Sequence, residues 1–462
     1  MLFSSTIFLF VFLPIVLLVY HLVPRFFRNG WLLVASLFFY AWGEPKFVLL
    51  MLASILINYL FALMVDTYRH RVGIKLVMAS MVITNLALLG WFKYSGFFMA
   101  SLNQTLQTEL FVPEVVLPIG ISFFTFQAMS YVIDVYREAG KVQKNPLDLA
   151  LYIALFPQLI AGPIVRYETV ANEINDRQET LPDFSLGVRR FIIGLSKKLI
   201  LANGCGQVAD AVFKMNDLSM GLAWIGIIAY ALQIYFDFSG YSDMAIGLGL
   251  MFGFHFLENF NYPYIAKSVS EFWRRWHISL GSWFRDYVYI PLGGNRVSPL
   301  KQYRNLAVVW MLTGLWHGAS WTFVAWGAYY GIWIMLEKAF LGKLLRRVPV
   351  ISTIWTLLLV LVGWVFFRAT TFPDALEYLR AMFIPTEVWD ERASYQLVQN
   401  GVILLLAAFA ATPLPKILGQ WVVERLGKVG QTIQYGYAMV LLFLATSALV
   451  ASTFNPFIYF RF

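Results

Sequence analysis

Cysteine is almost absent from this sequence, and charged residues are scarce. Cys205 is the one cysteine in 462 residues, so neither an internal disulfide nor a sulfur-ligated zinc site can form. Charged residues make up 13% of the chain and hydrophobic residues 59%, whereas about a quarter of a soluble domain is charged. Repeated apolar runs of roughly 18 or more residues are typical of membrane-spanning helices. The composition therefore predicts an all-α, polytopic membrane protein.

The excess of basic residues points to membrane lipids rather than to nucleic acid. The chain carries 35 lysine and arginine residues against 26 acidic ones. In a membrane protein such residues collect in short cytoplasmic loops, where anionic lipid attracts them and the insertion bias retains them. We therefore expect membrane lipids as partners, and no nucleic acid. Cys205 lies between Gly204 and Gly206, where a small buried filler is the simplest interpretation.

Successive apolar segments in the first third of the chain are typical of five spans: 6–23, 31–43, 47–65, 74–92 and 115–136. Basic residues follow the first, third and fifth segments, whereas loops 43–46 and 95–113 contain only Lys46. The positive-inside rule then predicts that the N-terminus lies outside the cytoplasm. No basic residue precedes Arg25, so the first segment is expected to be a retained span rather than a secretory signal.

Five further apolar segments are typical of spans: 303–317, 320–341, 351–368, 398–415 and 432–453. Together with the less regular region 148–260, the expected total is about eleven spans. The segment 156–163 is apolar but contains two prolines and a glycine, which favours a re-entrant or cavity-lining segment over a straight span. Residues 188–212 combine basic and apolar side chains, as an interfacial helix does. We expect one integral-membrane domain, made of N-terminal helices (1–147), a catalytic core (148–340) and C-terminal helices (341–462). Residues 371–397 hold five acids and two arginines, as an outer loop would.

One stretch of the core, residues 270–290, combines aromatic and basic side chains. Apolar and aromatic residues recur there at helical spacing: Trp273, Trp276, Leu280, Trp283, Phe284 and Tyr287. In a helix they share one face, while Arg274, Arg275 and Arg285 project from another and His277 lies at the border. Two interpretations remain open for the arginines. They either anchor an interfacial helix to lipid phosphate or bind an anionic donor such as the phosphates of coenzyme A.

His317 is the stronger catalytic candidate. It ends an apolar helical pattern and is followed by Gly-Ala-Ser and a second apolar segment. An ionisable side chain at membrane depth is costly unless it faces a polar cavity, so it is a functional candidate. A neutral imidazole can accept a hydroxyl proton and later return it, as acyl transfer to an alcohol requires. The alternative is a histidine that only forms a hydrogen bond between helices.

Two carboxylates, Asp237 and Asp243, lie inside an otherwise apolar run. They either orient a histidine or bind a cation, or they only cap helices and tie them together, and the sequence favours neither role. Ser239 and Ser242 are weak candidates for a covalent nucleophile, because no Gly-x-Ser-x-Gly elbow surrounds them. We predict no metal site.

Several motifs together resemble the membrane-bound O-acyltransferase family, and within it the bacterial alginate O-acetyltransferase type. The motifs are Leu117-Pro-Ile-Gly-Ile-Ser-Phe-Phe-Thr-Phe-Gln, Phe156-Pro-Gln-Leu-Ile-Ala-Gly-Pro, Tyr235-Phe-Asp-Phe-Ser-Gly-Tyr-Ser-Asp-Met-Ala, Glu271-Phe-Trp-Arg-Arg-Trp-His-Ile-Ser-Leu and Gly314-Leu-Trp-His-Gly. The resemblance implies tilted helices around a central funnel or tunnel. It places the family's invariant histidine at His317 and a second active-site position at His277. Weaker candidates for binding donor or substrate are the three arginines above, Trp276, Trp316, Asp237 and Asp243.

The resemblance also implies what the protein does. We expect an O-acetyltransferase of the bacterial inner membrane that takes acetyl groups from a cytoplasmic donor, acetyl-CoA, and binds no resident cofactor. The acceptor is expected to be an exopolysaccharide such as alginate or cellulose, reached directly or through an extracytoplasmic acetyltransferase or esterase-like partner. Two alternatives stay open: D-alanyl transfer to teichoic acid, and a non-catalytic transporter of an acyl donor or sugar lipid, since broken helices and buried charges also suit a transporter.

Overall fold

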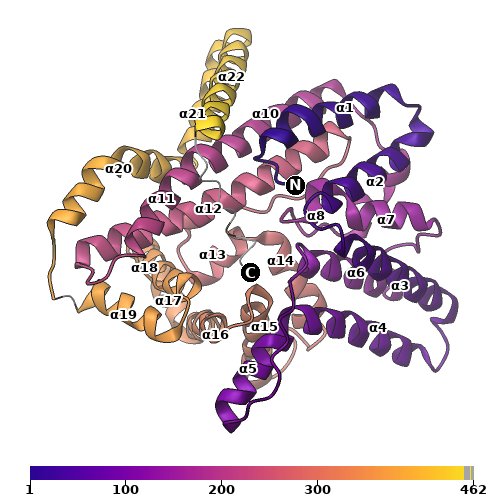
Figure 1. Ribbon diagram of the computed structural model, residues 1–462, viewed down its shortest axis with the longest axis horizontal. Coiled ribbons are helices and arrows are strands. Elements are labelled where there is room, and N and C mark those ends of the chain that lie inside the picture. Colours follow the sequence, from indigo (N-terminus) through magenta and orange to yellow (C-terminus); the bar gives the residue numbers. More distant parts are fainter. Residues whose placement is uncertain (385, 452–457, 459–462) are drawn as a thin grey trace. The chain divides into compact units, whose positions relative to one another are not determined.

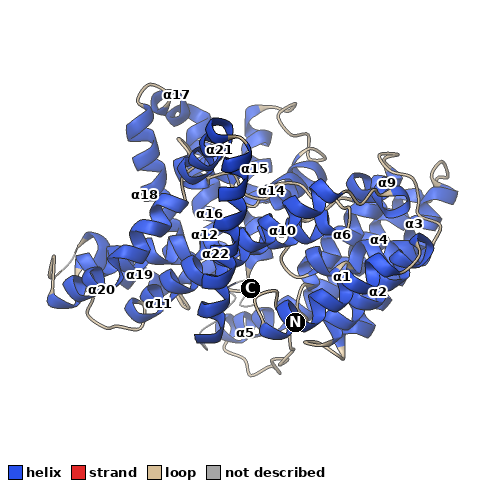
Figure 2. Cartoon of the chain, turned by 90° about the horizontal axis from the view of Figure 1, so that it is seen from above, coloured by secondary structure: helices blue, strands red, loops and turns tan. Residues whose placement is uncertain are grey.

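The computed structural model describes residues 1–384, 386–451 and 458. Over these residues the chain forms helices and no strand (Figures 1 and 2), which confirms the predicted all-α class. The chain divides into two compact units. The first comprises residues 1–191 and 244–257, and the second comprises 192–243 and 258–462. Helices α10 (Leu181–Ser196) and α12 (Met220–Met251) each contribute residues to both units.

The first unit contains the N-terminal helices. These are η1 (Phe8–Phe12), α1 (Leu13–Leu22), α2 (Arg25–Ala41), α3 (Phe47–Tyr68), α4 (Ile74–Leu89), η2 (Gly90–Tyr94), α5 (Ser95–Leu106), α6 (Ile121–Tyr136), α7 (Pro146–Ala154), α8 (Phe156–Leu159) and α9 (Tyr167–Asp176). Helix α6 is buried along almost its whole length, which is why its sequence shows no polar face. The proline-containing segment after α7 forms the short helix α8 and is also buried.

Polar groups inside the first unit form a connected network. The Tyr20 hydroxyl donates to Glu179 at 2.6 Å and accepts from the Arg177 Nε at 2.8 Å. Arg28 forms an ion pair with the same glutamate at 2.8 Å. Because buried charges are tolerated only when they are paired and hydrogen-bonded, this network explains how three charged residues fit beneath an apolar exterior.

The second unit contains the remaining helices. These are η3 (Lys197–Ala202), α11 (Asn203–Val212), most of α12, η4 (Pro263–Ile265), α13 (Val269–Arg275), α14 (Ile278–Phe284), η5 (Arg285–Tyr289), α15 (Pro299–His317), α16 (Trp321–Leu336), η6 (Glu337–Leu341), α17 (Gly342–Leu345), α18 (Pro349–Arg368), α19 (Phe372–Phe383), α20 (Glu391–Ala410), α21 (Leu414–Leu426) and α22 (Lys428–Ala451). All the η elements except η4 are π-helical turns within longer helices.

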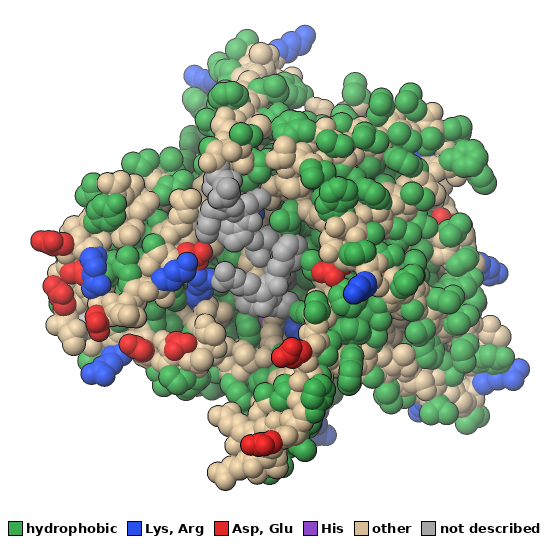
Figure 3. All heavy atoms as spheres, viewed as in Figure 1, with side chains coloured by type: hydrophobic (Ala, Val, Ile, Leu, Met, Phe, Trp, Pro, Cys, Tyr) green, Lys and Arg blue, Asp and Glu red, His purple; other side chains and the backbone are tan. Residues whose placement is uncertain are grey.

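Six helical stretches in the described residues are long and apolar enough to cross a membrane. They are Phe47–Tyr68, Ile74–Leu106, Met220–Met251, Pro349–Arg368, Glu391–Ala410 and Lys428–Ala451. Their burial differs widely, since 89% of the apolar window of α12 is buried but only 11% of that of α22. Large hydrophobic side chains are exposed on many other helices, and hydrophobic side chains are spread widely over the face seen in Figure 3. An exterior of this kind needs lipid around it, and the chain is accordingly a multi-pass membrane protein.

Three details differ from the sequence prediction. The helix that begins at Ile74 continues to Leu106, through part of the predicted loop 95–113. Residues 371–397 and the segment after α20 contain the additional helices α19 and α21. The predicted single helix over 270–290 is broken at His277 into α13 and α14. Both halves are helical, as the aromatic periodicity predicts, but their tertiary contacts favour a break between them over one continuous helix.

Helices α15 and α16 approach each other closely just before His317. A Cβ atom at Gly314 would overlap the carbonyl oxygen of Phe323 and lie 3.2 Å from the Cα of Gly327. A Cβ atom at Gly327 would in turn lie 2.5 Å from the Trp310 carbonyl oxygen. Small residues at such a crossing let two backbones pack together within a membrane. The crossing therefore fixes the end of α15, where the histidine lies.

Candidate active site

His317 is the last residue of α15, and only 3% of it is exposed. Its Nδ1 lies 2.8 Å from the backbone carbonyl oxygen of Thr313, one turn earlier. A carbonyl oxygen can only accept a hydrogen bond, so Nδ1 carries the proton of the neutral ring. Nε2 is then the basic nitrogen. The partial negative charge at a helix C-terminus stabilises an imidazolium there, so this position suits a residue that takes up a proton.

Aromatic rings surround His317. Its ring centroid lies 4.7 Å from that of Trp326, 5.0 Å from that of Trp316 and 5.5 Å from that of Phe367. A Cβ atom at the next residue, Gly318, would overlap the ring of Phe323. The imidazole is thus held in a tight apolar cage, where electrostatic interactions are stronger than in water.

His277 lies at the corner between α13 and α14, with its backbone in the left-handed region at φ +45°. It is 2% exposed. A residue other than glycine pays roughly 1–2 kcal/mol for this conformation. Such strain persists only where the surroundings enforce it, and it is often found at functional sites.

A short segment, Asn259–Asn261, holds this corner from both sides. The Asn261 backbone N–H donates to the carbonyl of Arg275 at 2.9 Å, and the Ile278 N–H donates to the carbonyl of Asn259 at 3.0 Å. The side chain of Asn259 accepts from both the backbone N–H and the hydroxyl of Ser279. These bonds bracket His277 along the chain and stabilise the strained backbone between them.

The other end of α13 is fixed by one buried carboxylate. Glu337 accepts hydrogen bonds from the Val269 N–H at 2.6 Å, the Ser270 N–H at 2.9 Å and the Ser270 hydroxyl at 2.6 Å. It satisfies two of the backbone donors that a helix N-terminus leaves unpaired, and its charge complements the helix dipole. Glu337 directly follows α16, which packs against α15. The segments that carry the two histidines are therefore braced against one another.

The two imidazoles share a neighbour. The indole of Trp316 lies 5.8 Å from the ring of His277 and 5.0 Å from that of His317, between ring centroids. Phe238 of α12 packs against His277 at 4.6 Å. Burial lowers the pKa of His277 well below its usual range, and repulsion from a protonated His317 lowers this pKa further. The structure thus brings both predicted histidines into one buried aromatic cluster, with His277 uncharged at neutral pH.

The three arginine candidates each have a local partner. Arg275 forms an ion pair with Glu271 at 2.8 Å, and Arg285 forms one with Asp286 at 2.7 Å. The Arg274 Nε donates to the backbone carbonyl of Ser270 at 3.2 Å. Arg275 and Arg285 would have to exchange an acidic partner to bind phosphate, whereas the Arg274 contact is to a neutral carbonyl. Trp276 packs in the core against Trp364, with 5.0 Å between their ring centroids.

The two aspartates pair with consecutive lysines on the π-helical turn η3. Asp237 lies 2.7 Å from the Lys198 Nζ, with each side chain only 3% exposed, and Asp243 lies 2.7 Å from the Lys197 Nζ. The second oxygen of Asp237 accepts from the backbone N–H of Ile458 at 2.8 Å. Of the two roles that the sequence left open, these contacts favour the structural one, because both carboxylates tie the helical turn η3 to α12.

Sequence reasoning missed several residues that position the candidate site. Asn259 and Glu337 carry no pattern that separates them from ordinary loop and helix residues, since each acts across a long sequence separation. The carbonyl of Thr313 could have been predicted, because residues i and i−4 are neighbours along a helix face.

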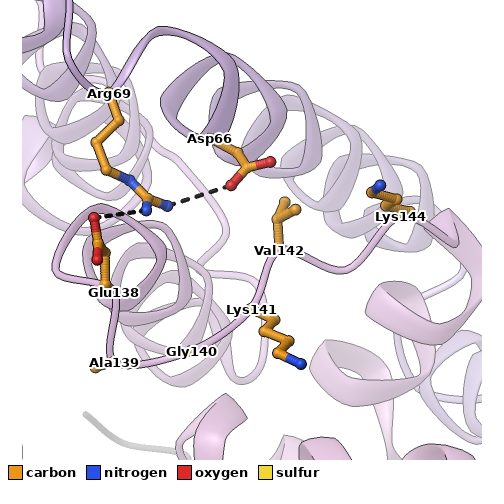
Figure 4. A pocket seen from close by; sticks show the side chains of 8 residues that line it. All are labelled: Asp66, Arg69, Glu138, Ala139, Gly140, Lys141, Val142 and Lys144. Atoms are coloured by element: carbon orange, nitrogen blue, oxygen red, sulfur yellow. Dashed lines mark hydrogen bonds and ion pairs between the residues drawn. The ribbon is translucent and has the colours of Figure 1, made fainter.

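A cavity of about 560 Å³ lies elsewhere, in the first unit (Figure 4). Asp66, Arg69, Glu138, Lys141 and Lys144 are among its lining residues. Figure 4 shows Arg69 between the two carboxylates, 3.3 Å from Asp66 and 3.0 Å from Glu138. Arg69 is thus already neutralised, and neither His277 nor His317 is among the lining residues.

A helical membrane protein with two buried histidines, one of them oriented as a base, has the features of an enzyme that transfers a group to a hydroxyl. Comparison with known proteins is consistent with this class. The model of the membrane-bound O-acyltransferase family matches residues 37–372. The chain belongs to this family and is an O-acyltransferase.

Named relatives are of three kinds. A protein of Azotobacter vinelandii named "probable alginate O-acetylase" is 41% identical over the whole of both chains. A peptidoglycan O-acetyltransferase of Helicobacter pylori is 38% identical, over 83% of this chain and 80% of its own. A teichoic acid D-alanyltransferase of Streptococcus thermophilus is 32% identical, over 49% of this chain and 58% of its own.

Proposed function

We propose that this protein O-acetylates an exopolysaccharide of the alginate or cellulose type, with acetyl groups drawn from cytoplasmic acetyl-CoA. The observation that carries the proposal is the buried histidine pair, in which the Nδ1 of His317 donates to the Thr313 carbonyl and leaves Nε2 basic. The relatives that match most of the chain are named as O-acetylating proteins. Both lines of support concern transfer of an acyl group to a hydroxyl.

The chemical step needs one base and a dry site. The acceptor hydroxyl oxygen attacks the thioester carbonyl, a C–O bond forms and the C–S bond breaks. His317 Nε2 takes the hydroxyl proton and returns it to the departing thiolate. His277, uncharged because it is buried beside His317, is assigned the positioning of donor or acceptor. The apolar cage around both rings would limit competing hydrolysis of the thioester.

The donor and acceptor lie on opposite sides of the membrane in this proposal. The N-terminus is placed outside the cytoplasm of a bacterial inner membrane, since basic residues collect in alternate loops. An acetyl group enters from the cytoplasmic face through a passage between the helices. It then reaches the polymer directly or through an extracytoplasmic acetyltransferase or esterase-like partner. The arginines of α13 and η5 remain weaker candidates for binding the phosphates of the donor.

The alternatives have less support. The D-alanyltransferase relative matches about half of this chain, whereas the acetyl-transferring relatives match 83% or more. A passive transporter needs neither a basic imidazole nitrogen nor a strained histidine corner. Acetyl transfer is therefore the function that the site supports best.

The direct experiment uses inverted membrane vesicles that contain the protein, supplied with acetyl-labelled coenzyme A. Polymer and extracytoplasmic partner are enclosed in the lumen. We expect label in ester linkage on the polymer or the partner with wild-type protein, and background label with His317→Gln at equal abundance. Equal labelling by the two proteins, or labelling only from a D-alanyl carrier protein, would contradict the proposal.

A further inference from the structure

Asn259 is buried, with 1% of its surface exposed, and lies in the second unit outside all helices. No chemical role follows from its side chain, because an amide neither titrates nor attacks a carbonyl. Its contacts nevertheless converge on the residues next to His277. Any effect of Asn259 on the reaction must therefore act through the histidine.

The backbone carbonyl and the side-chain amide of Asn259 bind the corner and its support. Its backbone carbonyl accepts from the Ile278 N–H at 3.0 Å. Its side-chain oxygen accepts from the Ser279 N–H at 3.2 Å and from the Ser279 hydroxyl at 2.9 Å. Its side-chain nitrogen donates to the Ser242 hydroxyl at 3.1 Å. Three of these bonds fix the first turn of α14, and the fourth reaches α12.

The hydrogen bond from Asn259 to Ser242 ties the corner to α12. Ser242 lies one turn after Phe238 on that helix, and Phe238 packs against the ring of His277. Asn259 therefore joins the backbone that follows His277 to the helix that contacts its imidazole. A side chain of this kind sets where the ring lies relative to Trp316, the neighbour that it shares with His317.

We propose that Asn259 is a positioning residue for acyl transfer, which holds the left-handed His277 corner against α12 so that the imidazole faces the His317 site. The inference rests on the proposed function and deepens it. Buried hydrogen bonds that orient an active group contribute through geometry, and a displacement of about 1 Å can reduce turnover by roughly 100-fold. Loss of Asn259 should therefore affect transfer more than abundance.

The test compares Asn259→Ala with Asn259→Asp in the vesicle assay, per folded molecule, at several pH values. Alanine removes all three side-chain bonds, and we expect transfer to fall at least about 10-fold with little change in the KM for acetyl-CoA. A protonated aspartic acid has the shape and the donor–acceptor pattern of asparagine, whereas the carboxylate lacks the donor. Transfer by Asn259→Asp, relative to wild type at the same pH, should therefore rise as the pH is lowered. The ratio for Asn259→Ala should stay constant.

The ratio to wild type removes the pH dependence that both proteins share through His277, His317, Asp243 and Glu258. The Asn259→Ala ratio shows the behaviour of the corner without a new carboxyl group, so a rise confined to Asn259→Asp is due to that group. A matched control is Asn58→Ala, which removes a buried asparagine of the first unit that pairs with Asn85 at 3.0 Å. This control should leave transfer per folded molecule unchanged.

A second variant keeps the test informative if Asn259→Ala does not fold. Ser242→Ala removes only the tie to α12, and we expect a smaller loss of several-fold. Wild-type transfer by folded Asn259→Ala or by Ser242→Ala would overturn the positioning role, as would an Asn259→Asp ratio that does not change with pH. Failure of the proposed function is separate, because it would appear as full transfer by His317→Gln.

Discussion

The two buried histidines are held in opposite ways. His317 completes a regular helix, and its ring is oriented by a carbonyl of the same helix one turn earlier. His277 interrupts a helix, in a strained conformation that residues from a separate loop and from α12 stabilise. The position of His317 therefore depends on local helical structure, whereas that of His277 depends on residues distant in the sequence. Substitutions at the two positions should therefore fail for different reasons.

The largest effect is expected for His317→Gln. Glutamine suits a helix and keeps a polar side chain but cannot take up a proton, so transfer should fall by about 100-fold or more. The abundance and the melting temperature should stay close to those of wild type. Both quantities can be measured on the same membrane preparation. Transfer above a tenth of the wild-type rate would show that this imidazole is not the base.

The next largest effect is expected at His277. Two substitutions there separate the effect of backbone strain on stability from the effect of losing the imidazole on transfer. Asparagine tolerates the left-handed region and valine does not. Both His277→Asn and His277→Val should reduce transfer, by roughly 10- to 100-fold. Only the valine variant should also lose about 1–2 kcal/mol of stability. Thermal unfolding in detergent distinguishes the two, and equal stability would argue against the strained corner.

A smaller effect is expected from Gly318→Ala. The added Cβ overlaps Phe323, whose ring lies 5.0 Å from Phe367 in the cage around His317. Overpacking of this kind costs about 1–3 kcal/mol and should slow transfer several-fold. Gly281→Ala, near the other histidine, is the control. Its new Cβ would meet nothing closer than the Trp273 carbonyl oxygen at 3.7 Å. Similar losses for both variants would contradict the local explanation.

The smallest effect on transfer is expected from Glu337→Gln. The amide keeps one acceptor oxygen, but its NH2 group faces N–H and O–H groups that are themselves donors. The hydrogen bonds lost in this way should lower the stability by about 1–3 kcal/mol. The melting temperature should fall, and transfer per folded molecule should change less than for any variant above. Glu424→Gln, on an exposed position of α21, is the control. An unchanged melting temperature for Glu337→Gln would show that the carboxylate does not brace α13.

Much of the fold followed from residue patterns. Apolar runs predicted an all-α membrane protein, and the end of α15 at His317 followed from the Gly-Ala-Ser sequence after it. The break at His277 did not follow, because an unbroken aromatic stripe runs through 270–290 and no glycine or proline marks the corner. The bonds that enforce the corner come from Asn259 and Asn261, which lie 14 to 20 residues upstream of the groups around the corner that they bind. The spacing of aromatic residues carries no information about such long-range hydrogen bonds.

The two histidines of the candidate site could be predicted from the sequence, but the residues that position them could not. A histidine at membrane depth is conspicuous because its burial is costly. Asn259 and Glu337 are ordinary residues until the fold brings Asn259 to the first turn of α14 and Glu337 to the first turn of α13. The aspartates of α12 were conspicuous for the same reason as the histidines, but the structure pairs each with a lysine of η3. Composition alone could not reveal those partners.

The most direct test of the central claim, that the two imidazoles form one site, is a double-mutant cycle with His277→Asn and His317→Gln. Transfer is measured for both single variants and for the double variant at equal abundance. Residues that act in the same step are strongly non-additive. If the two imidazoles form one site, the double variant will transfer about as slowly as His317→Gln alone. Losses that multiply, as for independent sites, would contradict it.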